Sequence, residues 1–252
     1  MRTLRVMLFM VYSLLFIGSF CYATPSTTYW TPDTMDIQPY KKWHITYDSY
    51  FTVGKKGAHK GDLPTDIGLT YGVLPFEKLK MEVGFDVLEP QNDPLSFNAK
   101  IGTPENALFE NSPALEVGIF NVGTKKNVTD YNIVDFITGK TLPFNLGRLH
   151  LGGYTGNSNT LKSAAGKKQA NGYMLAYDYG FWPVKDEKGE LKFNRYVLAG
   201  DYASGKNAIG GGGVGLYIYF TPDIDLLTGP VWFNDHALNG DMKWTMQLDI
   251  NF

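Results

Sequence analysis

Residues 243–252, KWTMQLDINF, alternate between polar and apolar side chains without interruption. The apolar set is Trp244, Met246, Leu248, Ile250 and Phe252, and the polar set is Lys243, Thr245, Gln247, Asp249 and Asn251. Successive side chains of a β-strand point to opposite faces, so this pattern predicts a strand with one apolar and one polar face. The strand ends on Phe252 with no polar residues after it, which is unusual for a strand at the edge of a water-soluble sheet.

The same alternation recurs along the chain, most clearly at residues 79–87, 95–101 and 43–51. Turn residues separate these stretches from one another, and 3.6-residue periodicity is not convincing anywhere after residue 23. The pattern predicts about twelve strands, at residues 43–54, 63–74, 79–89, 94–103, 113–123, 130–141, 147–156, 171–182, 194–204, 211–221, 224–233 and 243–252. The eleventh is the least regular, because Pro230 lacks an amide hydrogen and Leu226-Leu227 breaks the alternation.

The connections between these strands tend to alternate in length. Residues 75–78, 143–146 and 221–223 form tight turns, whereas the joins at 55–62, 124–129, 157–170, 205–210 and 234–242 are longer or more polar. Such alternation is expected when successive hairpins open toward opposite ends of a barrel. Two joins are long where the scheme requires short turns, residues 104–112 and 183–193.

A soluble sandwich or a lipocalin-like barrel would also alternate, with its apolar face inward. Four features favour a membrane barrel with its apolar face outward: strands of about 10 residues, an even strand number, aromatic residues near the strand ends and glycines on the polar face. Those glycines are Gly68, Gly72, Gly84, Gly118, Gly152 and Gly215, and the aromatic residues include Trp43, Tyr71, Trp182, Trp232 and Trp244. We therefore predict an all-β fold, a closed antiparallel transmembrane β-barrel of about 12 strands.

The N-terminus has the form of a secretory signal peptide. Arg2 and Arg5 precede an apolar run that leads to Ala23, so we expect cleavage after residue 23. A membrane anchor and a lipoprotein modified at Cys21 are the alternatives. The predicted organisation is a signal peptide at residues 1–23, an N-terminal lead or plug at 24–42 and the barrel at 43–252. Cys21 is the only cysteine, so the exported chain would contain no disulfide.

The signal peptide and the terminal strand together resemble bacterial outer-membrane β-barrel proteins. In that class the last strand is read by the barrel assembly machinery, which would implicate Trp244, Met246, Leu248, Ile250 and Phe252. Residues 67–86 and 95–105 are also similar to uncharacterised outer-membrane proteins. The resemblance implies location in the bacterial outer membrane, with outer-membrane lipid and the assembly machinery as partners, and it implies no substrate.

Candidate catalytic groups are few, and we predict that the protein is not an enzyme. An outer-membrane hydrolase would need a serine and a histidine on the lipid side, but His44 and His150 have the polar phase and Ser49 the opposite one. Asp235-His236 in a predicted loop could form a protease-like dyad, although a solvated surface pair is the simpler interpretation. Residues 205–215, GKNAIGGGGVG, lack the ending of a phosphate-binding loop. No histidine has metal-ligand spacing, so no metal or cofactor is expected.

The polar faces would line the lumen. Inward-phased residues predicted to line a pore are His44, Asp48, Asp66, Lys80, Glu82, Asp86, Lys100, Glu116, Asp135, His150, Asp178, Asp201 and Asp249, together with Gln247. Acidic groups dominate this set, whereas neither arginine outside the leader, Arg148 or Arg195, has a clear inward phase. We expect a narrow passive channel for small neutral or cationic solutes, and the alternative is a plugged structural barrel. Inward Tyr50, Tyr154, Tyr217 and Tyr219 could stack against a solute. Nothing suggests nucleic acid binding.

Overall fold

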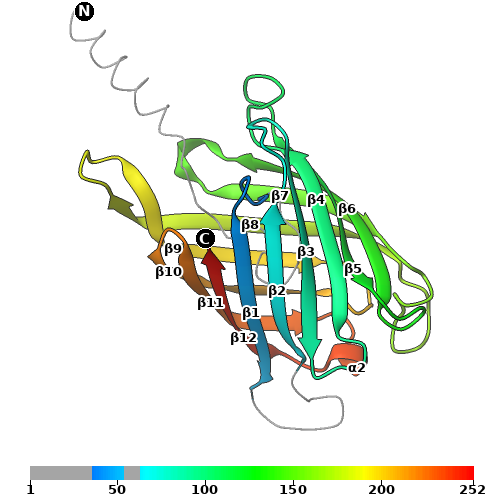
Figure 1. The fold of residues 1–252 in the computed structure, drawn as a ribbon. Helices are drawn as coiled ribbons and strands as arrows, with labels where there is room; N and C mark the ends of the chain where they lie inside the picture. The colour runs from blue at the N-terminus through cyan, green and yellow to red at the C-terminus, as the bar shows by residue number, and fades with distance from the viewer. Residues whose placement is uncertain (1–35, 54–62) are drawn as a thin grey trace, which may run out of the picture.

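The computed structural model describes residues 36–53 and 63–252, and these residues form a closed antiparallel barrel of twelve strands (Figure 1). The strands are β1 (Trp43–Thr52), β2 (Thr65–Gly72), β3 (Lys80–Glu89), β4 (Leu95–Thr103), β5 (Ala114–Gly123), β6 (Asp130–Thr141), β7 (Arg148–Thr155), β8 (Asn171–Lys185), β9 (Leu191–Ala203), β10 (Gly211–Thr221), β11 (Ile224–Phe233) and β12 (Lys243–Asn251). The fold class predicted from the alternation is confirmed.

The barrel closes between its first and last strands. β12 pairs with β1 over the whole length of both, from His44 opposite Asn251 to Thr52 opposite Lys243. On its other side β12 pairs with β11, so neither edge of the terminal strand is free. A closed barrel satisfies the backbone hydrogen bonds of every strand within the wall, which an open sheet cannot do at its edges.

The two faces of the wall differ in the way that the alternation predicts. In β12 the side chains of Lys243, Thr245 and Gln247 are at most 1% exposed, whereas those of Trp244 and Met246 are 37% and 44% exposed. Since the wall is a single sheet, the buried set faces the barrel interior and the exposed set faces outward. The outer surface is therefore apolar and the inner surface is largely polar, the reverse of a soluble barrel.

The two ends of the barrel carry different connections. The end that holds Trp43 and Asn251 is called the terminal rim, and residues 73–79, 104–113, 142–147 and 222–223 connect strands there. The opposite end, the loop rim, carries the joins at 53–64, 124–129, 156–170, 204–210 and 234–242. The connections follow the predicted distribution between the two ends with two exceptions, the short join at 90–94 on the loop rim and the long join at 104–113 on the terminal rim.

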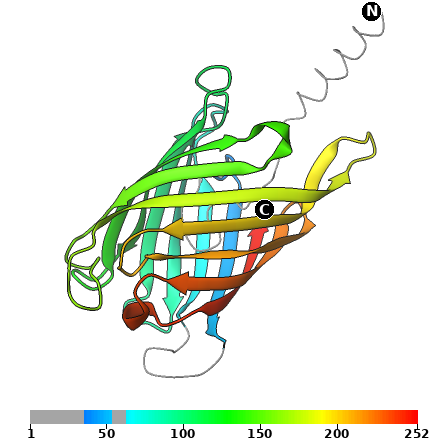
Figure 2. The same ribbon diagram turned by 180° about the vertical axis from the view of Figure 1, so that it is seen from behind.

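Residues 183–193 were expected to form a long loop, and that expectation is wrong. β8 and β9 continue their pairing to Lys185 opposite Leu191, and only residues 186–190 form the turn. The paired arm projects beyond the neighbouring strands at the terminal rim (Figures 1 and 2). Its charged residues remain compatible with a strand because their side chains, such as those of Lys185 and Lys192, are exposed.

The irregular eleventh segment is a full strand. β11 pairs with both β10 and β12, and Pro230 lies opposite Trp244. Leu227, Val231 and Phe233 are buried on its inner face, while Trp232 is exposed on its outer face. Both faces of this strand are rich in apolar side chains, which explains why its alternation was weak in the sequence.

Helical structure is sparse in the described ranges, where it comprises η1 (Pro143–Asn145) and α2 (His236–Asn239). Neither of these short elements has the length or the apolar character that crossing a membrane as a helix requires. The predicted signal peptide at residues 1–23 and the first part of the predicted lead, residues 24–35, lie outside the described residues.

Candidate functional site: the barrel interior

All the charged residues predicted to face the lumen lie on the inner face of the wall. Most are buried, and the half-buried ones are Asp66, Lys80 and Asp86. The buried members are His44, Asp48, Glu82, Lys100, Glu116, Asp135, His150, Asp178, Asp201 and Asp249, and Gln247 is buried with them. Their burial indicates that the interior is narrow and densely occupied by side chains.

One polar network crosses the seam between β1 and β12. His44 Nε2 lies 3.2 Å from Asp249 Oδ1, and His44 Nδ1 lies 3.1 Å from Asn251 Oδ1. Further along the seam, Gln247 Nε2 donates a hydrogen bond of 2.8 Å to the Tyr50 hydroxyl. The closing strands are therefore joined by side chains within the barrel as well as by their backbone ladder.

Carboxylates gather on the inner face of β1, β2 and β3 toward the loop rim. Asp48 lies directly opposite Asp66, and Asp86 lies opposite Gly68. Asn98 Nδ2 donates to Asp86 Oδ2 at 2.8 Å, and the Thr46 hydroxyl donates to Asp48 Oδ1 at 2.6 Å. This sector is acidic because three carboxylates, those of Asp48, Asp66 and Asp86, lie on three neighbouring strands.

Deeper in the barrel, toward the terminal rim, acidic and basic groups are paired. Lys100 Nζ lies 3.7 Å from Glu82 Oε1, and both side chains are buried. On the opposite wall, Arg148 Nε donates to both oxygens of Asp178 at 3.0 Å, and His150 Nε2 lies 3.0 Å from Asp178 Oδ2. Buried charges of this kind require partners, because desolvation without one is costly.

The inward position of Arg148 corrects the sequence interpretation, which gave neither arginine a clear inward phase. Arg148 is the first residue of β7, two positions before the inward His150, and the turn before it obscures the phase. Arg195 has the same phase as the buried Val197 and Ala199, and its guanidinium donates to the backbone oxygens of Tyr219 and Phe220 at the terminal rim.

Two further inward charges were missed. Lys243 is fully buried, and its Nζ donates to the Thr52 hydroxyl at 3.0 Å. Asp225 is likewise fully buried on β11. Lys243 shares the phase of Thr245 and could have been found from the alternation, whereas Asp225 lies in the strand whose alternation is irregular.

Residues 36–40 cross the interior at the terminal rim, and we refer to them as the crossing segment. Arg148 donates from both terminal nitrogens to the Asp36 carboxylate, at 2.8 Å each, while Tyr40 forms a parallel bridge with Gly72. Between these points, the Gln38 backbone N–H donates to Glu82, and Gln38 Nε2 donates to Asn251 Oδ1 at 3.0 Å. Ile37 and Gln38 are buried, so the segment lies within the barrel mouth.

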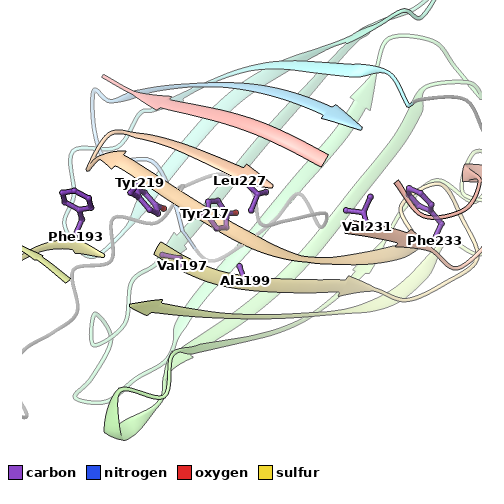
Figure 3. Close-up of a cluster of buried hydrophobic side chains, with 8 residues drawn as sticks. All are labelled: Phe193, Val197, Ala199, Tyr217, Tyr219, Leu227, Val231 and Phe233. Atoms are coloured by element: carbon purple, nitrogen blue, oxygen red, sulfur yellow. The ribbon is translucent and has the colours of Figure 1, made fainter. Parts of the chain in front are cut away.

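Part of the interior is apolar. One cluster runs along the inner faces of β9, β10 and β11 (Figure 3), where Tyr217 and Tyr219 stack with their ring centroids 6.2 Å apart. Its members are Phe193, Val197, Ala199, Tyr217, Tyr219, Leu227, Val231 and Phe233. Tyr50 packs against this cluster, so three of the four inward tyrosines contribute to one apolar surface.

A second apolar cluster closes the loop rim above β5 to β9. Leu161 and Ile209 come from loops and pack against wall residues that include Ile133, Tyr154 and Met174. Asn207 holds these loops together: its Nδ2 donates to the Tyr154 hydroxyl at 2.9 Å and to the Gln169 carbonyl at 2.6 Å. The lumen is consequently more open to solvent near the acidic sector than beneath these loops, as the half-buried Asp66 and Asp86 indicate.

The candidate catalytic groups are not assembled into a site. Asp235 caps α2 by accepting from the Ala237 N–H at 3.2 Å, and it also accepts from the Ala164 N–H. His236 Nδ1 lies 3.3 Å from Asp241 Oδ1, so the carboxylate that His236 contacts is that of Asp241. Ser49 and His44 lie on opposite faces of β1. Among the described residues, no group of three or more acidic or histidine side chains is placed to hold a metal ion.

No family model and no curated protein matches the sequence. Among solved structures, the KdgM porin has a TM-score of 0.53 at 9% identity, covering 83% of this chain and 99% of the porin. The NanC porin has a TM-score of 0.47 at 7% identity, covering 82% of this chain and 98% of the porin. At such identity, the likeness to the KdgM porin concerns the fold: the chain forms a porin-like barrel.

Proposed function

We propose that this protein is a β-barrel of the bacterial outer membrane and forms a narrow passive channel for small neutral or cationic solutes. The main support for this proposal is the charge of the inner wall, where acidic side chains outnumber basic ones two to one. The acids are Asp48, Asp66, Glu82, Asp86, Glu116, Asp135, Asp178, Asp201, Asp225 and Asp249, and the bases are Lys80, Lys100, Arg148, Arg195 and Lys243. Wall charges of one sign favour passage of the opposite ion, because a narrow constriction focuses their field.

The outer surface supports the membrane location. Apolar side chains cover the outward positions of every strand, and large ones such as Phe136 and Tyr47 are about half exposed. Exposed apolar area of this extent is a liability in water and is required in lipid. The predicted signal peptide and the porin-like fold agree with this location.

The terminal strand supports a role in assembly. Trp244, Met246, Leu248, Ile250 and Phe252 form the outward stripe of β12, the strand that closes the barrel. We propose that the barrel assembly machinery reads this stripe.

The test of the channel is conductance of the purified protein in a planar bilayer under a salt gradient. A reversal potential of cation-selective sign is expected. Asp66→Asn should lower this selectivity, because Asp66 is a half-buried member of the acidic sector, whereas Glu187→Gln at the exposed β8–β9 turn should leave it unchanged. Anion preference of the unmodified protein would contradict the charge argument.

A second candidate function is a plugged structural barrel without conduction. The burial of most inward charges, the two apolar clusters and the crossing segment favour it. The same recordings separate the two proposals. A correctly folded barrel that conducts no ions would support the structural role.

A further inference from the structure

We propose that the crossing segment is a gate held shut by the ion pair between Asp36 and Arg148, with residues 39–42 as its hinge. The inference rests on the proposed channel and adds a means of regulating it. A segment that only connects to the first strand would need no contact with the opposite wall of the barrel. Residues 36–40 nevertheless make such a contact, through Asp36 and Arg148 on β7.

The strand order places the two anchor points on opposite walls. In the closed ring of twelve strands, β7 is five strands from β2 in one direction and seven in the other. Asp36 binds Arg148 on β7, and Tyr40 pairs with Gly72 on β2, next to β1. Residues 36–40 therefore span the mouth from one wall to the other, and a solute that leaves or enters at the terminal rim has to pass them.

The far end of the segment is held by a strong contact. Both terminal nitrogens of Arg148 donate to the two oxygens of Asp36, which is the bidentate geometry that a guanidinium forms best with a carboxylate. Asp178 fixes the orientation of Arg148 by accepting from its Nε, and His150 contacts Asp178 in turn. The Arg148 and Asp36 side chains are only 14% and 21% exposed, so water screens the pair less than it screens a surface ion pair.

The near end of the segment is fixed by backbone hydrogen bonds. The Lys41 N–H donates to the Gly72 carbonyl at 2.9 Å, and the Gly72 N–H donates to the Lys42 carbonyl at 3.0 Å. The Lys42 N–H also closes a turn onto the Pro39 carbonyl, and Lys41 has a positive φ of 62°. Release of Asp36 would thus free the far end while residues 39–42 remain attached to the wall.

Two contacts of Gln38 support the closed position. Its backbone N–H donates to Glu82, which also pairs with Lys100, and its side chain donates to Asn251 at the seam. These contacts link the closed segment to the ion pairs of the near wall. The Asp36 pair reaches the far wall on β7, so its loss should favour opening of the mouth.

The experiment uses Asp36→Asn, which keeps the size of the side chain and removes its charge. Loss of a charge-assisted, bidentate pair should shift the ratio of open to closed states about tenfold or more toward open. Asp36→Glu keeps the carboxylate and should retain most of the closed state. Glu105→Gln is the matched control, because it removes an ion pair with Lys140 at the same rim but outside the barrel mouth.

Two measurements are made on each variant. The first is channel conductance in a planar bilayer. The second is the rate at which a charged thiol reagent modifies Ile37→Cys, a buried position in the middle of the segment. Since Cys21 lies within the predicted leader, this residue would be the only thiol of the exported protein.

A gate requires that Asp36→Asn raise both the labelling rate and the conductance, and that Asp36→Glu and Glu105→Gln change neither strongly. An unchanged labelling rate in Asp36→Asn would overturn the latch. Faster labelling with an unchanged, measurable conductance would show that the segment moves without blocking passage, and it too would overturn the gate. Faster labelling of Asp36→Asn with no conductance in any variant would contradict both the gate and the channel. Measurable conductance with unchanged labelling of Asp36→Asn would support the channel and contradict the gate.

Discussion

Trp43 and Phe252 exchange both of their backbone hydrogen bonds across the seam of the barrel. The Trp43 N–H donates to the Phe252 carbonyl at 2.9 Å, and the Phe252 N–H donates to the Trp43 carbonyl at 3.0 Å. The final residue therefore completes the ladder at the terminal rim, while its ring remains 55% exposed on the outside. The Trp43 ring lies beside that of Tyr71, with centroids 4.3 Å apart, so aromatic side chains surround the seam at this rim.

Deletion of Phe252 should lower the yield of folded barrel and leave export across the inner membrane intact. The deletion removes two ladder hydrogen bonds and the aromatic end of the outward stripe on β12. Heat-modifiable gel mobility of the membrane fraction measures the folded share. Phe220→Ala is the comparison, because Phe220 is a similarly exposed aromatic residue at the same rim but lies on β10. Equal yields from the two variants would contradict a special role for the terminal strand.

Val83→Arg should destabilise the barrel by about 2–4 kcal/mol, because it places a charge on the lipid side of the wall near the middle of β3. Asn98→Arg should cost much less, since Asn98 faces the interior next to Asp86. The midpoint of urea unfolding in lipid vesicles, followed by gel mobility, reports the difference. If both variants unfold at the same midpoint, the assignment of the two faces is wrong.

Gly72→Ala should displace the crossing segment. A Cβ atom built on Gly72 would lie 2.0 Å from the Pro39 carbonyl oxygen and 2.6 Å from that of Gln38, and both neighbours are backbone atoms. Gly153→Ala is the control, because the nearest atom to its added Cβ is 3.4 Å away. The labelling rate of Ile37→Cys should rise in the first variant only. A similar rate in both would mean that the near end of the segment tolerates the extra methyl group.

Asn207→Ala should loosen the loops that close one side of the loop rim. The change leaves the Tyr154 hydroxyl, the Gln169 carbonyl and the Ile209 N–H without the bonds that Asn207 provides, at a local cost of about 1–3 kcal/mol. Proteolysis within residues 156–170 should become faster, whereas the exposed Asn159→Ala should have little effect. An unchanged rate of cleavage would mean that the apolar cluster around Leu161 and Ile209, and not Asn207, stabilises these loops.

The strand positions and the two faces of the wall could be predicted because period-two alternation is a local property. β5, β6, β10 and β12 lie within one residue of their predicted bounds for this reason. The prediction failed where local pattern and environment diverge. Residues 183–193 are rich in charged residues, a pattern that predicts a loop, but the β8–β9 arm pairs as a hairpin whose charged side chains are exposed while Phe193 packs into the apolar cluster.

The interior was only partly predictable. The phase identifies which side chains point inward, as with His150 and Asp178, but it does not tell which of them meet across the barrel. Arg148 and Asp36 are far apart in sequence, and residues 36–40 have no periodicity from which their position across the barrel could be predicted. The apolar cluster on β9 to β11 was only partly predictable: the phase places Tyr217 and Tyr219 inward, but the irregular alternation of β11 hides Leu227, Val231 and Phe233.

The crossing segment also has a mechanical consequence. A barrel wall is one sheet thick, so its circular cross-section can flatten into an ellipse while the ladder hydrogen bonds persist. The segment ties the walls at Arg148 and Gly72 and resists lengthening of that one diameter. In a bilayer, lateral tension that stretched the rim along this direction would act on the contact between Asp36 and Arg148 and would favour its release. The barrel would resist deformation along this one diameter while the Asp36–Arg148 pair is intact, and it would deform more easily once the pair is broken.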